Sequence, residues 1–192
     1  SKLCSDKIFL SANNIKGSRT TKFSIVRYGN VLGSRGSVVP IFVNLNKKNK
    51  KFNLTHKEMT RFNITLEEGV DFVNWCLKNN KGGEIFVPKL NSFKVIDLAK
   101  AINQNAKFQN IGLRPGEKIH EELISESDSL NTLEGKSHFV ILNYHTKNDI
   151  KNYKKKNKLK DLKSTLRYSS DLNKSFLSIS SLRKILKINK FI

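Results

Sequence analysis

The order of apolar and polar residues predicts that helices and strands alternate along the chain. Apolar residues at helical spacing predict helices at 3–15, 38–46, 66–79, 93–102, 119–124 and 181–188. Short apolar runs between glycine, asparagine and lysine predict strands at 22–27, 52–55, 61–64, 84–87, 108–111 and 137–143. This alternation indicates the α/β fold class.

Two segments carry more specific expectations. Thr65 is suited to cap the helix 66–79. The inner face of that helix is expected to consist of Val70, Val73, Trp75 and Leu77. From 146 to 170 the sequence is polar and rich in lysine, which predicts a mobile connection.

The charge of the chain is strongly positive, with 36 basic and 16 acidic residues and a net charge of +20. Residues 136–192 hold 15 of the basic residues and 3 of the acidic ones. Nucleic acids attract such a charge, but the densest run, 154–160, has only Tyr153 beside it for stacking on bases. A solvated surface is the favoured interpretation, so we expect no specific nucleic-acid partner.

Other classes of protein are disfavoured by what the sequence lacks. No apolar run approaches the roughly 20 residues that span a bilayer, and the first residues do not resemble a signal peptide. Cys4 and Cys76 form neither a C-x-x-C motif nor a zinc-binding spacing, so we expect no metal site. We expect a reduced, cytoplasmic protein without a membrane partner.

Four motifs in a fixed order carry a resemblance to a known family. They are VRYGNVLGSRGSVVP at 26–40, EMTRFNIT at 58–65, GGEIFVPK at 82–89 and GLRPGEK at 112–118. Together they resemble the second half of the UDP-N-acetylglucosamine 4,6-dehydratases, and more narrowly the inverting members that open bacterial pseudaminic acid biosynthesis. That family belongs to the extended short-chain dehydrogenase/reductase superfamily.

The resemblance implies the C-terminal part of an extended Rossmann-type dehydrogenase/reductase with a smaller substrate-binding domain. Residues 1–36, interleaved with 82–90, would end the NAD-binding region, 37–145 would mostly bind the UDP-sugar, and 146–192 would form a lysine-rich C-terminal extension. The sequence has no G-x-G-x-x-G between a strand and a helix, and it does not begin with methionine. We therefore expect a portion of a larger enzyme that is inactive alone and homo-oligomeric when complete.

The implied reaction uses NAD or NADP to oxidise C4 of UDP-N-acetylglucosamine, eliminate water across C5 and C6, and return the hydride to C6. Such a reaction would serve polysaccharide biosynthesis for surface glycans or flagellin. The first residues, SKLCSDK, resemble the end of the family's Tyr-x-x-x-Lys motif. The resemblance gives Lys2 a catalytic role, in which its charge favours the phenolate of that tyrosine, and a contact with the nicotinamide ribose. It places Tyr28 beside the nicotinamide.

The same resemblance assigns eight residues to the UDP-sugar. They are Asn30, Arg35, Ser37, Val38, Pro40, Arg61, Arg114 and Glu117. Arg61 and Arg114 would hold the diphosphate, because a planar guanidinium offers two parallel donors. Glu117 would accept hydrogen bonds from the ribose hydroxyls, and the segment 37–40 would meet the uracil ring.

Two alternatives stay open. A nucleotide-sugar 4-epimerase of the same superfamily is the first, because the residues that separate the two reactions belong to the family's first half. A basic nucleic-acid-binding module is the second, and it predicts salt-dependent RNA binding that is lost on deletion of 147–163.

Overall fold

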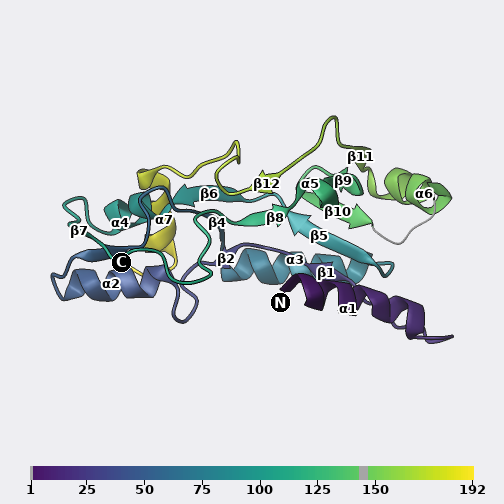
Figure 1. Cartoon of the computed structure of the whole chain (residues 1–192), viewed down its shortest axis with the longest axis horizontal. Helices are drawn as coiled ribbons and strands as arrows, with labels where there is room; N and C mark the ends of the chain where they lie inside the picture. The colour runs from purple at the N-terminus through teal and green to yellow at the C-terminus, as the bar shows by residue number, and fades with distance from the viewer. Residues whose placement is uncertain (1, 143–146) are drawn as a thin grey trace. The chain divides into compact units, whose positions relative to one another are not determined.

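The computed structural model describes residues 2–142 and 147–192, which form two compact units (Figure 1). Unit 1 comprises Ser1–Tyr28, Glu67–Lys89 and Leu123–Arg167. Unit 2 comprises Gly29–Leu66, Leu90–Glu122 and Tyr168–Ile192. Residues 37–145, expected to bind mostly the UDP-sugar, are thus shared between the units, and their assignment stays a prediction. The expected boundary at 145–146 lies outside the described residues.

Unit 1 is built on a five-stranded mixed sheet. Its order is β1 (Ile25–Val26), β5 (Glu84–Pro88), β10 (His138–Leu142), β9 (Thr132–Glu134) and β11 (Lys160–Asp161). β1 runs parallel to β5, and the other neighbours are antiparallel. β5 and β10 are buried along their whole length, which agrees with their nearly continuous apolar sequences. Of the predicted strand 137–143, Asn143 lies outside the described residues.

Two long helices of unit 1 confirm the periodicity of the sequence. They are α1 (Lys2–Ile15) and α3 (Leu66–Asn79). The predicted inner face of α3 was largely wrong, since Val70 and Leu77 are 50% and 67% exposed. The inward residues are Gly69, Phe72, Val73 and Cys76, which follow the i, i+3, i+4, i+7 spacing of one helix face. In α1 only Leu10 is buried among the apolar residues.

The lysine-rich segment after residue 146 was wrongly expected to be a mobile connection. It forms α6 (Lys147–Asn157) and β11, and the short helix α5 (Glu126–Ser129) precedes it in the chain. Ile150, Tyr153 and Leu159 pack on an apolar cluster of unit 1 that includes Cys76 and Phe86. Three apolar residues on one side are sufficient to dock the segment, although most other positions are polar.

A buried carboxylate secures this docking. Glu84 on β5 is fully buried, and it accepts hydrogen bonds from the Ser24 hydroxyl at 2.7 Å and from the backbone N–H groups of Lys81 and Gly82 at 2.6 and 2.8 Å. The hydroxyl of Tyr153 on α6 donates to the same carboxylate. With four donors, Glu84 retains in the interior the hydrogen bonds that water would provide outside.

Unit 2 is built on two small sheets covered by helices. One has the order β2 (Asn30–Val31), β4 (Thr60–Ile64) and β6 (Asn91–Lys94), and the other pairs β3 (Phe52–Leu54) with β7 (Phe108–Asn110). The helices are α2 (Val38–Lys47), α4 (Val95–Ile102) and α7 (Ile179–Ile188). Phe42, Phe52, Leu98, Leu182 and Leu186 belong to their common apolar core. The short strands β8 (Glu122–Ile124) and β12 (Tyr168–Ser169) lie where the chain leaves one unit for the other.

The last helix is an integral part of unit 2. Figure 1 shows α7, in yellow, next to α4, and Arg183 on α7 donates to the carbonyls of Ala101 at 2.9 Å and Lys100 at 3.3 Å. These bonds satisfy carbonyl groups that the end of α4 leaves free. None of the helices in the described part of the chain has the length and apolar character needed to cross a membrane.

Candidate functional site

Several predicted site residues follow the carboxyl end of β1, the position where α/β folds commonly bind ligands. Tyr28 lies two residues beyond β1 and is 38% exposed, and Asn30 begins β2. Between them, Gly29 approaches β4 so closely that a Cβ atom there would lie 2.5 Å from the Cβ of Phe62. The glycine is therefore required for the path of the chain at this point.

The segment from Leu32 to Ser37, which we call the glycine loop, leads from β2 to α2. Its amides are held by hydrogen bonds from Leu32 to Ile64 at 2.8 Å, from Ser34 to Val31 at 3.2 Å and from Ser37 to Ser34 at 3.0 Å. Arg35 is exposed at its tip.

The glycine loop ends at the first turn of α2, which contains three predicted site residues. Ser37 is the N-cap residue, Val38 is the first helical residue, and Pro40 lies in the first turn. The hydroxyl of Ser37 is buried and has no partner among the described residues. It is therefore available as a donor or acceptor for a group that approaches the start of the helix.

Arg114 and Glu117 lie in one tight turn of unit 2, which we call the Arg114 turn (residues 112–118). The N–H of Glu117 donates to the Arg114 carbonyl at 3.0 Å, and the Glu117 carboxylate accepts from the Arg114 N–H at 3.1 Å. Gly112 and Gly116 both adopt a φ of 76°, which favours glycine. Arg114 is exposed, so its side chain is accessible to solvent, while its backbone N–H is bonded to the Glu117 carboxylate.

Arg61 on β4 is engaged by the protein itself. Its Nη1 donates to the carbonyls of Thr60 at 2.7 Å and Ile119 at 2.8 Å, and its Nη2 donates to the Lys118 carbonyl at 3.0 Å and contacts the Met59 sulfur at 3.1 Å. Burial lowers the pKa of Arg61, whereas the nearby carboxylates of Glu121 and Glu117 act in the opposite direction. Arg61 and Glu117 are thus close enough to interact electrostatically.

Glu121 is a central residue that the sequence did not single out. It accepts from the Phe62 N–H at 3.4 Å and lies 3.8 Å from Nε of Arg61. With the Asn30 amide oriented so that its nitrogen faces the carboxylate, that nitrogen lies 2.6 and 3.2 Å from the two oxygens. Asn30, Arg61 and β4 are therefore organised around one carboxylate.

The helix predicted at 119–124 was wrong, and this is why Glu121 was missed. The chain bends at residues 119 and 120 and enters β8 at Glu122. A helix would use the carbonyls of Lys118 and Ile119 as acceptors for its own N–H groups, but Arg61 occupies both. The one signal in the sequence was that Glu117 and Glu121 would form a like-charge pair on the predicted helix, which disfavours that helix.

A second polar chain supports the same segment. The hydroxyl of Thr60 shares hydrogen bonds with His120 Nδ1 at 2.8 Å and with the Ser170 hydroxyl at 2.7 Å. The Glu121 N–H donates to the Ser170 hydroxyl at 2.9 Å. The backbone beside Glu121 is therefore held from both sides.

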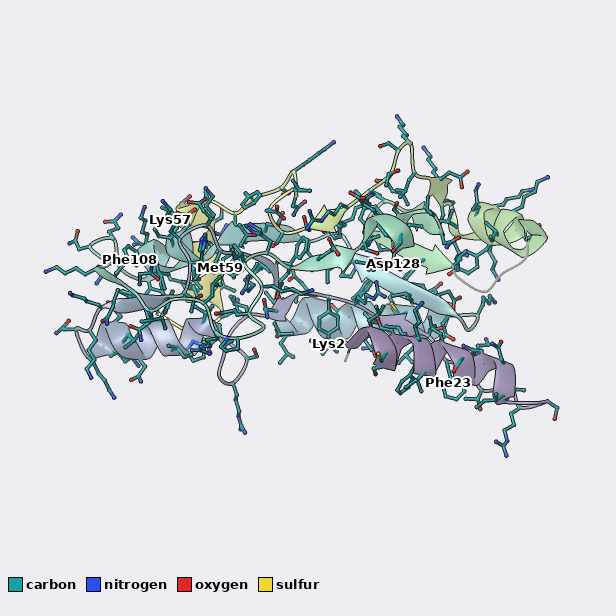
Figure 2. All side chains as sticks on the ribbon, viewed as in Figure 1. Lys2, Phe23, Lys57, Met59, Phe108 and Asp128 are labelled. Carbon is teal, nitrogen blue, oxygen red and sulfur yellow. The ribbon has the colours of Figure 1, made fainter. Side chains whose placement is uncertain are left out.

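Lys2 belongs to unit 1, where it is exposed in the first turn of α1 (Figure 2). Arg27 fixes this helix, since its Nε contacts Asp6 at 2.9 Å and its Nη1 contacts Asp128 at 2.8 Å. Asp6 lies one turn after Lys2, so the Arg27 ion pairs limit how the helix that carries Lys2 can move.

The structure thus brings Asn30, Arg61 and Glu117 to the surroundings of Glu121, and places Arg114 in the same turn as Glu117. Arg35, Ser37, Val38 and Pro40 follow β2 on the glycine loop and α2, while Lys2 and Tyr28 belong to unit 1. The roles predicted for all ten residues stay predictions. Within the described residues, no group of three or more His, Cys, Asp or Glu side chains could hold a metal ion.

Comparison with known proteins gives a consistent set of relatives. The family described as "Polysaccharide biosynthesis protein" matches residues 1–143. A protein of Campylobacter jejuni subsp. jejuni serotype O:2 named UDP-N-acetylglucosamine 4,6-dehydratase (inverting) is 50% identical over 141 residues, which are 73% of this chain and 42% of that protein. A Rickettsia rickettsii protein named UDP-glucose 4-epimerase is 36% identical over 132 residues, which are 67% of this chain and 39% of that protein.

A solved structure described as "X-ray structure of Pen from Bacillus thuringiensis" has the same architecture. It is 34% identical, with a TM-score of 0.82, and the match covers 97% of this chain and 55% of that one. The predicted α/β fold of Rossmann type is therefore confirmed. The chain spans less than half the length of the curated relatives it matches.

Proposed function

Since this chain belongs to the polysaccharide biosynthesis protein family, we propose that it is the nucleotide-sugar-binding part of an NAD(P)-dependent UDP-N-acetylglucosamine 4,6-dehydratase. The resemblance predicted from four sequence motifs is confirmed by the relative that is 50% identical and carries this name. The match covers 42% of that relative, so the complete activity is part of the proposal.

The Arg114 turn is the observation that carries the proposal. It carries one exposed arginine and one carboxylate, three residues apart, on a backbone fixed by two hydrogen bonds. A guanidinium suits the oxygens of a diphosphate, and a carboxylate suits the hydroxyls of a ribose. We assign these two partners to Arg114 and Glu117.

For Arg61 we propose a supporting contribution to the same diphosphate site. The Nη atoms of Arg61 already donate to three carbonyl groups. A phosphate could therefore accept two hydrogen bonds from Arg61 only if it displaced the carbonyl groups of Lys118 and Ile119. Arg61 instead holds the chain that follows Arg114 and adds positive charge. Glu121 lies beside both Arg61 and Asn30 and so orients the two side chains.

The glycine loop and the start of α2 are proposed to meet the uracil and sugar. Ser37 brings a buried hydroxyl without a partner among the described residues, and Val38 and Pro40 bring apolar surface to the same helix turn. A uracil ring needs hydrogen-bonding groups at its edge and apolar contact over its face, and this combination provides both. Arg35, exposed at the loop tip, is assigned to the substrate side.

NAD or NADP, when bound, supplies the hydride acceptor at C4 and the hydride donor at C6. The ammonium of Lys2 has three donors, which suit the hydroxyls of a nicotinamide ribose, and its charge favours the ionised form of a phenol one helical turn earlier. Tyr28, 38% exposed beyond β1, offers a ring beside which a nicotinamide can lie. Lys2 and Tyr28 therefore suit the nicotinamide end of the dinucleotide. The G-x-G-x-x-G motif that would bind its diphosphate does not occur in the sequence printed here.

A 4-epimerase is the second candidate, because a protein with that name is 36% identical over 132 residues. Mass spectrometry of the product from the enzyme that contains this chain separates the two reactions. A dehydratase makes a product lighter than the substrate by one water, whereas an epimerase makes an isomer of equal mass.

The binding step is testable with the 192-residue chain itself. Saturation-transfer NMR is expected to show contact with the uracil and ribose of UDP-N-acetylglucosamine and weaker contact with ADP-glucose, because the proposed site is shaped for uracil. Equal transfer to both nucleotides, or none to either, would contradict the proposal.

A further inference from the structure

The last aromatic residue of the chain lies against the glycine loop. A Cβ atom built on Gly33 would lie 1.8 Å from Cζ of Phe191, 2.4 Å from its Cε1 and 2.8 Å from its Cε2. The Phe191 ring therefore fills the space that a side chain at position 33 would occupy. Gly33 and Phe191 both belong to unit 2.

The position of Phe191 is set by the way α7 ends. The N–H of Lys190 donates to the Lys187 carbonyl at 3.0 Å, and the N–H of Phe191 donates to the Leu186 carbonyl at 2.9 Å. Lys190 has a φ of 57°, so the chain reverses in the left-handed conformation common after helix ends. The reversal directs the ring away from the helix axis at a fixed point.

The helix itself has little freedom. Leu182 and Leu186 are 1% and 0% exposed in the core of unit 2, and Arg183 is bonded to the end of α4. Phe191 is half-buried against the same core. The ring is thus carried by a rigid element, and the glycine loop is the part that it can restrain.

The glycine loop has no side chain at position 33 with which to restrain itself. Gly33 has a φ of 75° and Gly36 a φ of 73°, and both residues are free to adopt many backbone conformations. The amides of Ser34 and Ser37 make local hydrogen bonds, and the amide of Leu32 links the start of the loop to Ile64 on β4. An external aromatic ring is the additional contact that limits its conformations.

We propose that Phe191 is a positioning residue, which holds the glycine loop in the conformation that receives the UDP-sugar. The inference rests on the proposed function, since that function assigns Asn30, Arg35 and Ser37 to the substrate. It extends the site beyond residues 1–143, the part that the family matches. In this proposal Phe191 acts through its contact with Gly33 and does not itself touch the substrate.

Amide hydrogen exchange and UDP affinity of the 192-residue chain test this role. In Phe191→Ala, and in a chain that ends at Lys190, the amides of Leu32, Ser34 and Ser37 are expected to exchange about tenfold faster. UDP is expected to bind about threefold or more weakly. Phe191→Leu keeps most of the apolar volume, so its loop amides should exchange, and it should bind UDP, nearly as the parent chain does. Ile188→Ala is the matched control, because Ile188 is 67% exposed on the same helix and should change neither.

Each outcome decides the proposal. Loop amides that exchange at the parent rate in both variants would overturn it. An equal rise at Leu98 and Ala99, in the core of α4, would overturn it as well, because Phe191 would then support the whole unit. If only the loop amides respond and the parent chain does not bind UDP, the positioning by Phe191 stands and the proposed function fails.

Discussion

At the scale of single residues, Arg61 and Arg114 show how two identical side chains can have different surroundings. Arg61 is partly buried and hydrogen-bonded to the protein's own carbonyls, whereas Arg114 is exposed in a turn that contains Gly112 and Gly116. The sequence placed both at motif positions, but it could not show which guanidinium had free donors. That distinction depends on contacts between residues far apart in the chain.

Replacement of Arg61 by lysine tests its supporting role. A single ammonium cannot reach the carbonyls of Lys118 and Ile119 in the geometry of the guanidinium fork. We expect the free energy of unfolding, measured with urea, to fall by about 1–3 kcal/mol. Arg19→Lys is the control, since Arg19 is exposed, and an equal stability of the two variants would contradict this role.

Two buried groups give a prediction for alkaline pH. Burial raises the pKa of the Cys76 thiol to about 12, and burial together with Glu84 raises the pKa of the Tyr153 hydroxyl. A raised pKa means that the folded state keeps a proton that the unfolded chain has lost. The stabilisation from these groups is therefore complete below about pH 9 and decreases as the pH rises above it.

The variant Tyr153→Phe isolates the contribution of that hydroxyl. Between about pH 9 and 11, its free energy of unfolding should fall less steeply than that of the parent, because one of the two groups can no longer ionise. Urea unfolding at several pH values measures the slopes. Identical slopes would show that Tyr153 does not titrate with unfolding.

At the scale of secondary structure, α6 is a clear case in which composition misled the prediction. The lysines suggested a solvated connection, but Ile150 and Tyr153 on α6 and Leu159 just after it pack on the apolar cluster of unit 1. We expect Leu159→Ala to lower the free energy of unfolding by about 2–4 kcal/mol, because Leu159 is 6% exposed.

Lys155→Ala is the matched control for this measurement. Lys155 is exposed on α6, so its removal should change the free energy of unfolding by less than about 0.5 kcal/mol. If Leu159→Ala is as stable as Lys155→Ala, the segment is not docked in solution.

The sequence was sufficient to predict helices and strands that are marked by the spacing of apolar residues within the segment itself. Helical spacing was sufficient for α1, α2, α4 and α7, and the buried strands β5 and β10 follow from their apolar runs. The predicted strand 22–27 is only Ile25–Val26, the two residues that pair with β5. Residues 119–121 are not helical, because Arg61 binds the carbonyls of Lys118 and Ile119, and no local pattern encodes this contact.

The candidate site was predictable to a similar extent. Motif resemblance singled out Asn30, Arg61, Arg114 and Glu117. In the structure Glu117 is hydrogen-bonded to Arg114 and interacts electrostatically with Arg61, while Asn30 is linked to Arg61 through Glu121. Glu121 and Phe191 were missed because their importance comes from tertiary contacts. A carboxylate in an apparent helix and an aromatic residue at the end of the chain have no distinctive spacing.

At the scale of the whole molecule, the charge of +20 raises the rival account of a nucleic-acid-binding module. The two accounts predict different responses to Arg114→Ala. In the enzyme account this variant loses affinity for UDP and keeps whatever salt-dependent RNA affinity the lysines provide. In the rival account, deletion of 147–163 abolishes a strong RNA affinity, which filter binding at several salt concentrations would measure.

The isolated chain is also expected to show no dehydratase turnover. The phenol that Lys2 is proposed to activate would lie four residues before it, outside the printed sequence. Incubation with UDP-N-acetylglucosamine and NAD should leave the substrate mass unchanged. Formation of the dehydrated sugar by these 192 residues would contradict the catalytic assignment of Lys2.

The most direct measurement is a calorimetric titration of UDP into the 192-residue chain and into two variants. The account predicts that the parent binds UDP, that Arg114→Ala binds it about tenfold or more weakly, and that Lys107→Ala, an exposed cation of the same unit, binds it like the parent. A parent chain without affinity for UDP, or an Arg114→Ala variant with the affinity of the parent, would contradict the central claim that the Arg114 turn holds the diphosphate.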